Sequence, residues 1–297
     1  MHKRRKKTLY NTLFASSIGI DYIIFDFEGD KYDITPSELS KALQRLEKVD
    51  GSSKIIVTMA ARADRFDVHT AHTDLNDFIE LSESFDNLGF CLVAGNSAYL
   101  SDFEKTKQVS EVVELSRYIS DRNSNSQEIF IGTEKCMNPT LTILQHLAEE
   151  QGYKHKYIPF LLKSEAAAAE IQMIKQQVTS KFTFALYAPY LYTNSNNGIT
   201  QKLYEYIIRR KGVNGELGIK NGDIPAFDEL DIMKKALLRN YAEKLSLYGD
   251  FSTISNEITN LRRTGFEIVV GLTLDDDVKQ VRSLKEACIR ANELLAA

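Results

Sequence analysis

The sequence has little cysteine, and its cysteines do not form the pairs that bind zinc or build a disulfide framework. Cys91, Cys136 and Cys288 lie far apart among 297 residues, and no C-x-x-C pair is present. We therefore expect no metal site of that kind. A reducing compartment suits such a chain, so we predict a cytoplasmic protein.

Long apolar runs are also missing. No run reaches the roughly 18 residues of a membrane span, because polar residues interrupt the stretch that follows the basic start. This stretch leads into the strand-like sequence IIFDFE and not into a small-residue cleavage site, which argues against a signal peptide. We therefore expect no membrane partner.

Three signatures of common enzyme classes are absent. The sequence contains no G-x-G-x-x-G after its first predicted strand, no G-x-x-x-x-G-K-[ST] and no G-x-S-x-G. The first two form nucleotide-binding loops, and the third forms the nucleophile elbow of serine hydrolases. The standard nucleotide folds and the serine hydrolases are therefore disfavoured.

A net positive charge is concentrated in one short segment, and the rest of the chain is acidic. The chain has a formal net charge of -4, whereas Lys3, Arg4, Arg5, Lys6 and Lys7 alone carry +5, so the rest of the chain carries -9. A nucleic-acid surface needs basic residues spread over a face, so no extensive surface of that kind is expected. We predict that residues 1–10 form a basic disordered tail, and contact of this tail with RNA or anionic lipid is the alternative.

The sequence does contain a regular alternation of short apolar runs and helical patterns. This alternation predicts parallel strands joined by crossover helices. Strands are predicted at residues 22–27, 54–59, 90–94, 128–131, 156–161, 182–187 and 267–271. Helices are predicted at residues 35–49, 74–86, 106–122, 139–151, 165–178, 200–210, 225–247, 251–264 and 275–295.

The fold class that follows is α/β. We predict a (β/α)8 TIM-barrel-like fold in a single domain over residues 11–297, with an incomplete or modified first unit. The predicted strands are one short of a barrel, so we expect a hidden or displaced strand in residues 211–224, which hold four glycines and no periodic core. In such folds the chemistry is carried by residues that follow the strands.

Four polar residues at or after the ends of the first two predicted strands are candidates for catalysis. Asp26 and Glu28 lie on one face of a strand end, where two carboxylates can bind a divalent cation or act as acid and base. After the next strand, Arg62 can clamp a phosphate or carboxylate, and His69 can transfer protons. We predict these four residues on the substrate side, and loop capping or a solvated loop is the alternative.

Two glycine-containing segments follow strands directly and are candidates for cofactor binding. They consist of Gly95, Asn96 and Ser97, and of Gly132 and Thr133. A glycine lets the backbone approach a phosphate, which the N–H groups and a hydroxyl can then hold. The alternative is that the glycines only make turns.

Tyrosines at a later strand end are further candidates. Tyr187 and Tyr190 could line an apolar pocket for a flat cofactor and offer hydroxyls to its edge. Aromatic residues are enriched in strands for packing reasons as well, which leaves a purely structural role as the alternative.

The closing part of the chain resembles the bacterial-luciferase-like superfamily. The resemblance rests on residues 248–258 (YGDFSTISNEI), then on residues 261–270 (LRRTGFEIVV), and in outline on residues 19–25 (GIDYIIF). It implies a shortened or divergent, archaeal-type member of the superfamily. It also implies a (β/α)8 barrel that uses FMN or coenzyme F420 for hydride transfer or monooxygenation of a small-molecule substrate. By this resemblance Gly132, Thr133 and the loop from Tyr187 to Tyr190 come nearest to the cofactor phosphate.

Two other functions stay open at this point. A barrel lyase or aldolase could act on a phosphorylated metabolite through Asp26 and Glu28. A non-catalytic relative could keep the fold as an interaction module and cover an incomplete barrel edge with a partner or a second copy, which makes a homo-oligomer an option.

Overall fold

The computed structural model describes most of the chain. The described residues are 2–26, 36–48, 53–60, 73–93, 102–122, 128–132, 144–147, 155–178, 181–193, 200–208, 213–218, 225–275 and 277–297. The chain divides into two compact units where the sequence predicts one domain. Unit 1 comprises residues 1–161 and 169–185, and unit 2 comprises residues 162–168 and 186–297.

Parallel strands form the centre of unit 1. They are β1 (Tyr22–Asp26), β2 (Lys54–Ala60), β3 (Leu88–Val93), β4 (Glu128–Gly132) and β5 (Lys156–Leu162), and they pair in chain order. The interiors of β2, β3 and β4 are buried on both faces, which explains why their sequences are apolar throughout. β1 pairs with β2 over its whole length, from Tyr22 opposite Lys54 to Asp26 opposite Thr58.

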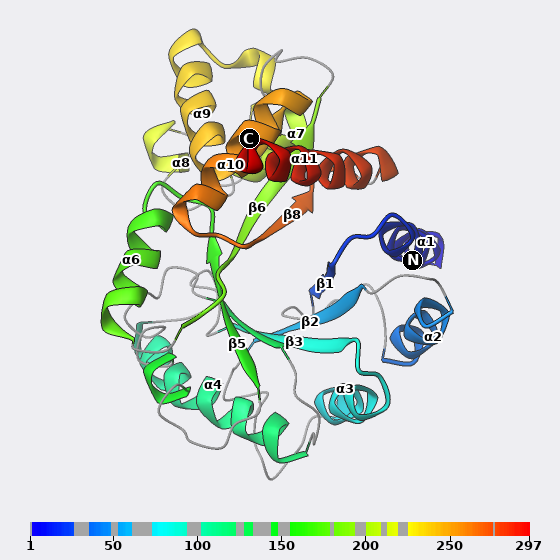
Figure 1. Cartoon of the computed structure of the whole chain (residues 1–297). Helices are drawn as coiled ribbons and strands as arrows, with labels where there is room; N and C mark the ends of the chain where they lie inside the picture. The colour runs from blue at the N-terminus through cyan, green and yellow to red at the C-terminus, as the bar shows by residue number, and fades with distance from the viewer. Residues whose placement is uncertain are drawn as a thin grey trace. The chain divides into compact units, whose positions relative to one another are not determined.

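Helices alternate with these strands along the chain, as predicted (Figure 1). They are α2 (Pro36–Leu46), α3 (Thr73–Ser84), α4 (Asp102–Arg122) and α6 (Ala167–Gln177), and residues 144–147 are also helical. In α2 the buried residues are Leu39, Ala42, Leu43 and Leu46, which is the spacing of one helix face. Pro36 is the first residue of α2, where the φ angle fixed by the proline ring matches that of a helix.

A further helix, α1 (His2–Ser17), precedes the first strand. It takes in the basic residues that the sequence analysis places in a disordered tail. Its second half packs through Thr12, Ala15 and Ser16, which are buried. Gly19 adopts a positive φ of 75° just after the helix, where its N–H donates to the Ser16 carbonyl. The polar and small residues of this helix give little apolar periodicity, so the sequence pattern does not reveal it.

Unit 2 is built around β6 (Ala185–Tyr192), which pairs in parallel with β7 (Leu247–Gly249) and also pairs with β8 (Ile268–Thr273). Its other elements are α7 (Gln201–Ile208), α8 (Val213–Glu216), the 3-10 helix η1 (Phe227–Glu229), α9 (Ile232–Leu245), α10 (Phe251–Thr264) and α11 (Val278–Ala296). Apolar residues of α7 pack with Leu191, Leu238 and Ala242 into a buried core.

The remaining strand lies elsewhere than predicted. Within residues 211–224, the described positions 213–216 form the short helix α8 and not a strand. The additional strand is β7, whose first residue the sequence analysis gives to a helix over 225–247. Ser246 ends α9 with an extended backbone, and only three strand residues follow. A strand of three residues is too short to show periodicity, which explains the error.

The helix α10 occupies the predicted residues because its ends carry clear signals. The Asp250 side chain accepts a hydrogen bond from the Thr253 N–H and caps the first turn. Gly265 ends the helix with a φ of 113°, and its N–H donates to carbonyls of the last turn. Phe266 follows and is buried.

The end of β6 is held by a side chain that replaces a neighbouring strand. Gln280 of α11 accepts a hydrogen bond from the Tyr192 N–H at 2.7 Å and donates one to the Tyr192 carbonyl at 3.0 Å. The carboxamide therefore satisfies both backbone groups of one residue.

Among the described helices, none is long and apolar enough to cross a lipid bilayer.

A buried lysine links the elements of unit 2. Lys163 directly follows β5, and only 5% of its side chain is exposed. Its Nζ donates to the carbonyl oxygens of Glu243 at 2.6 Å and Lys244 at 3.3 Å, and it forms an ion pair with Glu257 at 3.1 Å. Glu243 and Lys244 lie in the last turn of α9, where carbonyls lack partners within the helix and a cation is favoured. Lys163 thus connects α9 and α10 within unit 2.

We predict that Lys163→Met lowers the free energy of unfolding by about 1–3 kcal/mol, because it leaves buried carbonyls without their donor. The control is Lys202→Met, whose ion pair with Asp275 is exposed on both sides, at 54% and 42%. That control should lose less than about 1 kcal/mol. Urea denaturation measures both, and equal losses would contradict a special role for Lys163.

Candidate functional site

One face of the sheet in unit 1 is concave. Tyr22 and Glu128 lie on strands three positions apart, which in a flat sheet places them about 14 Å from each other. The Tyr22 hydroxyl nevertheless lies 2.9 Å from Glu128 Oε2. The sheet must therefore curl so that these side chains meet across its inner face. Strand alternation then assigns every second residue of each strand to this concave face.

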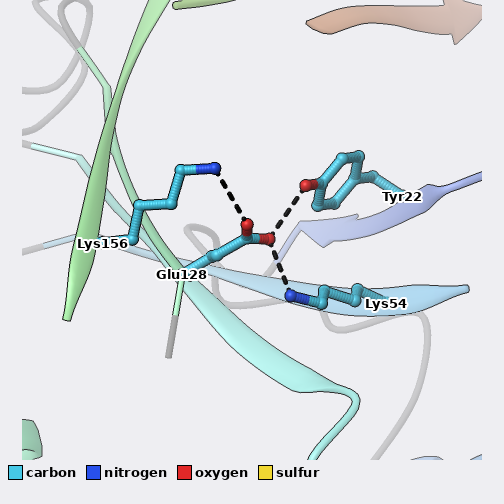
Figure 2. A network of polar contacts seen from close by, with 4 residues as sticks. All are labelled: Tyr22, Lys54, Glu128 and Lys156. Carbon is cyan, nitrogen blue, oxygen red and sulfur yellow. Dashed lines mark hydrogen bonds and ion pairs between the residues drawn. The ribbon is translucent and has the colours of Figure 1, made fainter. Parts of the chain in front are cut away.

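The amino end of the concave face carries a polar network around one carboxylate (Figure 2). Glu128 Oε2 accepts hydrogen bonds from Tyr22 and from Lys54 Nζ, both at 2.9 Å, and Glu128 Oε1 accepts one from Lys156 Nζ at 3.2 Å. The carboxylate side chain is 15% exposed, whereas the lysines are 43% and 51% exposed. The network joins four strands at their first residues.

The network shifts the pKa values of its members. Burial raises the pKa of Glu128, but the hydrogen bonds from Lys54 and Tyr22 outweigh burial, so the pKa is lowered overall. Burial and the hydrogen bond to Glu128 raise the pKa of the Tyr22 hydroxyl. The lowered pKa favours the ionised carboxylate, and both of its oxygens accept hydrogen bonds. Residues at the amino ends of barrel strands serve stability, and this network fits that role.

Aromatic rings form the next layer of the concave face. Phe130 packs edge-on against Tyr22, with ring centroids 5.4 Å apart, and against Phe160 at 5.7 Å. Phe130 is fully buried and Phe160 is partly exposed. Of the two phenylalanine rings, Phe160, which pairs with Gly132 near the carboxyl ends of the strands, is thus the more accessible.

On β2 to β5, the described residues at the carboxyl end of the concave face are apolar apart from one hydroxyl. We call Thr58, Val93, Gly132 and Phe160 the strand-end floor, because register and alternation place them on this face near the ends of β2 to β5. Val93 and Phe160 are partly exposed, and Thr58 is buried. A Cβ atom added to Gly132 would overlap Cγ1 of Val93. The floor is closely packed, and its apolar surface suits the face of a flat ring.

Two of the predicted site residues of unit 1 lie at this end of the sheet. Asp26 is the last residue of β1 and pairs with Thr58, and Gly132 is the last residue of β4. Gly132 packs closely against Val93, and its expected approach to a phosphate stays a prediction. The other predicted residues lie outside the described part of the chain. They are Glu28, Arg62, His69, Gly95, Asn96, Ser97 and Thr133.

The two predicted tyrosines lie on β6 in unit 2. Tyr190 is fully buried, and its hydroxyl lies 2.6 Å from Ser283 Oγ of α11. Its predicted contact with a cofactor stays a prediction. Burial raises the pKa of its hydroxyl. Tyr187 is partly exposed, and its carbonyl accepts a hydrogen bond from the Lys163 N–H at 2.8 Å. Strand alternation places the two rings on opposite faces.

The sequence analysis did not identify two polar groups that form several hydrogen bonds and ion pairs in the structure. These are the Glu128 network and Lys163. Their signal was available, since Lys54, Glu128 and Lys156 each open an otherwise apolar predicted strand, and Lys163 follows one. No group of three or more His, Cys, Asp or Glu side chains that could hold a metal ion occurs in the part of the chain that the structure describes.

Comparison with known proteins identifies a family and a fold. The model of a family of unknown function (DUF7388) matches residues 5–280. A search of curated proteins found no match to the sequence.

Solved structures resemble the chain over nearly its whole length. An F420-dependent secondary alcohol dehydrogenase in complex with an F420-acetone adduct has a TM-score of 0.59 at 10% identity, covering 97% of this chain and 95% of that one. The oxygenating constituent of 3,6-diketocamphane monooxygenase from the CAM plasmid of Pseudomonas putida, in complex with FMN, has a TM-score of 0.58 at 10% identity, covering 96% and 93%. Apo-MsnO8 has a TM-score of 0.59 at 11% identity, covering 98% and 93%. At these identities the likeness shows the fold, so the predicted α/β, TIM-barrel-like class is confirmed.

We predict that Gly132→Ala lowers the free energy of unfolding by about 1–3 kcal/mol, because the new methyl group overpacks the floor against Val93. Adding Val93→Ala should restore part of the loss, since it removes the overlapping atom. Gly215→Ala is the control, because a Cβ there meets nothing within 4 Å. Chemical denaturation measures all three variants, and a double variant less stable than Gly132→Ala would argue against this packing account.

A second prediction concerns pH. The pKa of Glu128 is lower in the folded chain than its unfolded value of about 4.3, so its contribution to stability is present above that pH and is lost as the pH falls through the folded pKa. Glu128→Gln should therefore cost stability at about pH 6, and this cost should shrink toward about pH 3. Unfolding free energies measured across this range provide the test.

The control for this pH prediction has the opposite sign. Burial raises the pKa of Glu170 in α6, so its carboxyl group favours the folded chain at low pH and loses that contribution as the pH rises through the folded pKa. Glu170→Gln should therefore gain stability relative to the unmodified chain between about pH 4 and pH 6. The same pH trend in both variants would overturn the assignment for Glu128.

Proposed function

The chain belongs to the family of unknown function DUF7388, and we propose that it is a luciferase-like oxidoreductase that uses coenzyme F420 or FMN. The observation that carries the proposal is the structural likeness over nearly the whole chain to an F420-dependent dehydrogenase and an FMN-containing monooxygenase. The sequence resemblance in residues 248–270 points to the same superfamily. A shared fold alone does not fix a function, so the argument also needs a suitable site.

The strand-end floor supplies that site in unit 1. Its partly exposed residues, Val93 and Phe160, are apolar, and an isoalloxazine or deazaflavin ring can lie flat against such a surface. Phe130 packs edge-on against Phe160. When bound, the cofactor supplies the acceptance or donation of hydride, and the protein supplies orientation and electrostatics.

The remaining assignments follow the order of residues along the chain. Asp26, at the end of β1, belongs to the substrate side together with Glu28, Arg62 and His69. Gly95, Asn96, Ser97 and Thr133 follow strands whose ends adjoin the floor, so their backbone N–H groups and hydroxyls are assigned to the cofactor phosphate. Tyr190 is not assigned to the site, because its hydroxyl is committed to Ser283 within the core of unit 2.

The test is a titration of the purified full chain with FMN and with F420, followed by cofactor fluorescence. We expect saturable quenching by at least one of them. Phe160→Leu should weaken binding by about three- to tenfold, because an aromatic contact contributes about 0.5–1.5 kcal/mol. Phe227→Leu is the matched control, since Phe227 is a partly buried phenylalanine in the core of unit 2.

Two outcomes would overturn the proposal. Absence of binding by both cofactors would remove the redox function and leave the lyase and interaction readings. Equal weakening by Phe160→Leu and Phe227→Leu would remove the floor as the cofactor site. Retained cofactor binding combined with full turnover in an Asp26→Asn, Glu28→Gln variant would show that these carboxylates are not needed on the substrate side.

A further inference from the structure

Helix α9 presents two large apolar side chains to solvent at its amino end. Ile232 is 85% exposed and Met233 is 80% exposed, the highest values among the large apolar residues that the structure describes. Ala236 is exposed as well, and at about 100° per residue it lies between the other two around the helix. We call these three residues the apolar tip. Single exposed apolar residues are ordinary, whereas a contiguous group marks a contact surface.

The segment before α9 holds the apolar tip in place. Asp231 caps the helix, because its side chain accepts a hydrogen bond from the Lys234 N–H at 2.8 Å. Leu230 is buried in the core of unit 2. Lys235 Nζ donates to the Asp228 carbonyl at 3.0 Å. The first turn of α9 is therefore fixed, and a contact through it costs little conformational entropy.

Charges of opposite sign lie before and after the apolar tip. Asp228 precedes it and Arg239 follows it, and both residues are exposed. Arg239 lies seven residues after Ile232, so the two share one helix face about 10 Å apart along the axis. Neither Asp228 nor Arg239 forms an ion pair with another residue that the structure describes. Both charges are therefore available to a partner.

This arrangement is complementary to itself. In an interface with two-fold symmetry, every contact between two different residues occurs twice, once in each direction. When two copies of α9 meet in antiparallel orientation through their tips, Asp228 of each copy lies on the side of Arg239 of the other. Apolar surface then meets apolar surface, and opposite charges meet on both sides. A partner with one sign of charge would match only one side.

We propose that the apolar tip of α9 joins two copies of this chain in a reversible homodimer. The contact involves few residues in each copy, so it falls in the class of small interfaces that bury less than about 1,200 Å² and associate weakly. We expect a dissociation constant on the order of 100 μM.

Sedimentation velocity of the full chain between about 5 and 500 μM tests the proposal, and the mean sedimentation coefficient should rise with concentration. Met233→Gln should weaken dimerisation about tenfold or more, because an apolar contact is lost. Glutamine is a good helix former, so α9 is retained, and circular dichroism checks this. The matched control is Met173→Gln in α6, where the methionine is 37% exposed. This control should dimerise like the unmodified chain.

Charge reversal tests the orientation of the two helices. Asp228→Arg and Arg239→Asp should each weaken dimerisation several-fold, because like charges then meet at both symmetric positions. A mixture of the two variants should associate again, since opposite charges face each other in the mixed dimer. The control pair is Glu286→Arg and Lys279→Asp, which makes the same charge changes at exposed positions of α11. Each of these controls should dimerise like the unmodified chain.

Four results would overturn the proposal. The first is a chain that stays monomeric up to about 500 μM. The second is equal weakening by Met233→Gln and Met173→Gln, and the third is a mixture of the charge variants that associates no better than either alone. The fourth is a monomeric chain that binds phosphatidylcholine vesicles and loses this binding in Met233→Gln, which would assign the apolar tip to a lipid surface.

Discussion

The curvature of the sheet in unit 1 depends on one carboxylate. Glu128 receives hydrogen bonds from the first residues of β1, β2 and β5, although β1 is three strands away. A largely buried carboxylate without donors is strongly unfavourable, and these donors converge on it only because the sheet curls. The charged contacts and the curvature therefore support each other. Phe130 and Phe160, two and four residues farther along their strands, fill the space that this curvature encloses.

The sequence was sufficient for most of the strands because burial on both faces leaves a continuous apolar run. It was sufficient for both ends of α10 because Asp250 and Gly265 have distinct capping chemistry. Periodicity could not reveal β7, which has three residues, or α1, whose packed positions are threonine, alanine and serine. These elements depend on tertiary contacts and hardly on local pattern.

The site was less predictable than the fold, for a related reason. A glycine after a strand signals equally a close approach to a ligand or to a neighbouring side chain, and at Gly132 the structure shows Val93 in that place. A strand tyrosine signals equally a pocket or a core, and Tyr190 is bonded to Ser283 in the core. The spacing of residues in the sequence gives the face of the element on which a residue lies. What covers that face is known only from the folded structure.

The residues behind the superfamily resemblance have structural duties in the folded chain. Gly249 takes a φ of 124° at the end of β7, Asp250 caps α10, Ile254 and Ile258 are buried, and Gly265 ends the helix. These are requirements of a strand, turn and helix unit, so the resemblance carries information about the fold and little about chemistry.

We look for chemical function instead where side chains are accessible and are not needed to form the backbone structure. On the concave face of unit 1 the amino end carries the ion network of Glu128, whereas the carboxyl end offers the partly exposed apolar side chains of Val93 and Phe160. The asymmetry between these two ends favours the carboxyl end as the place where a ligand binds.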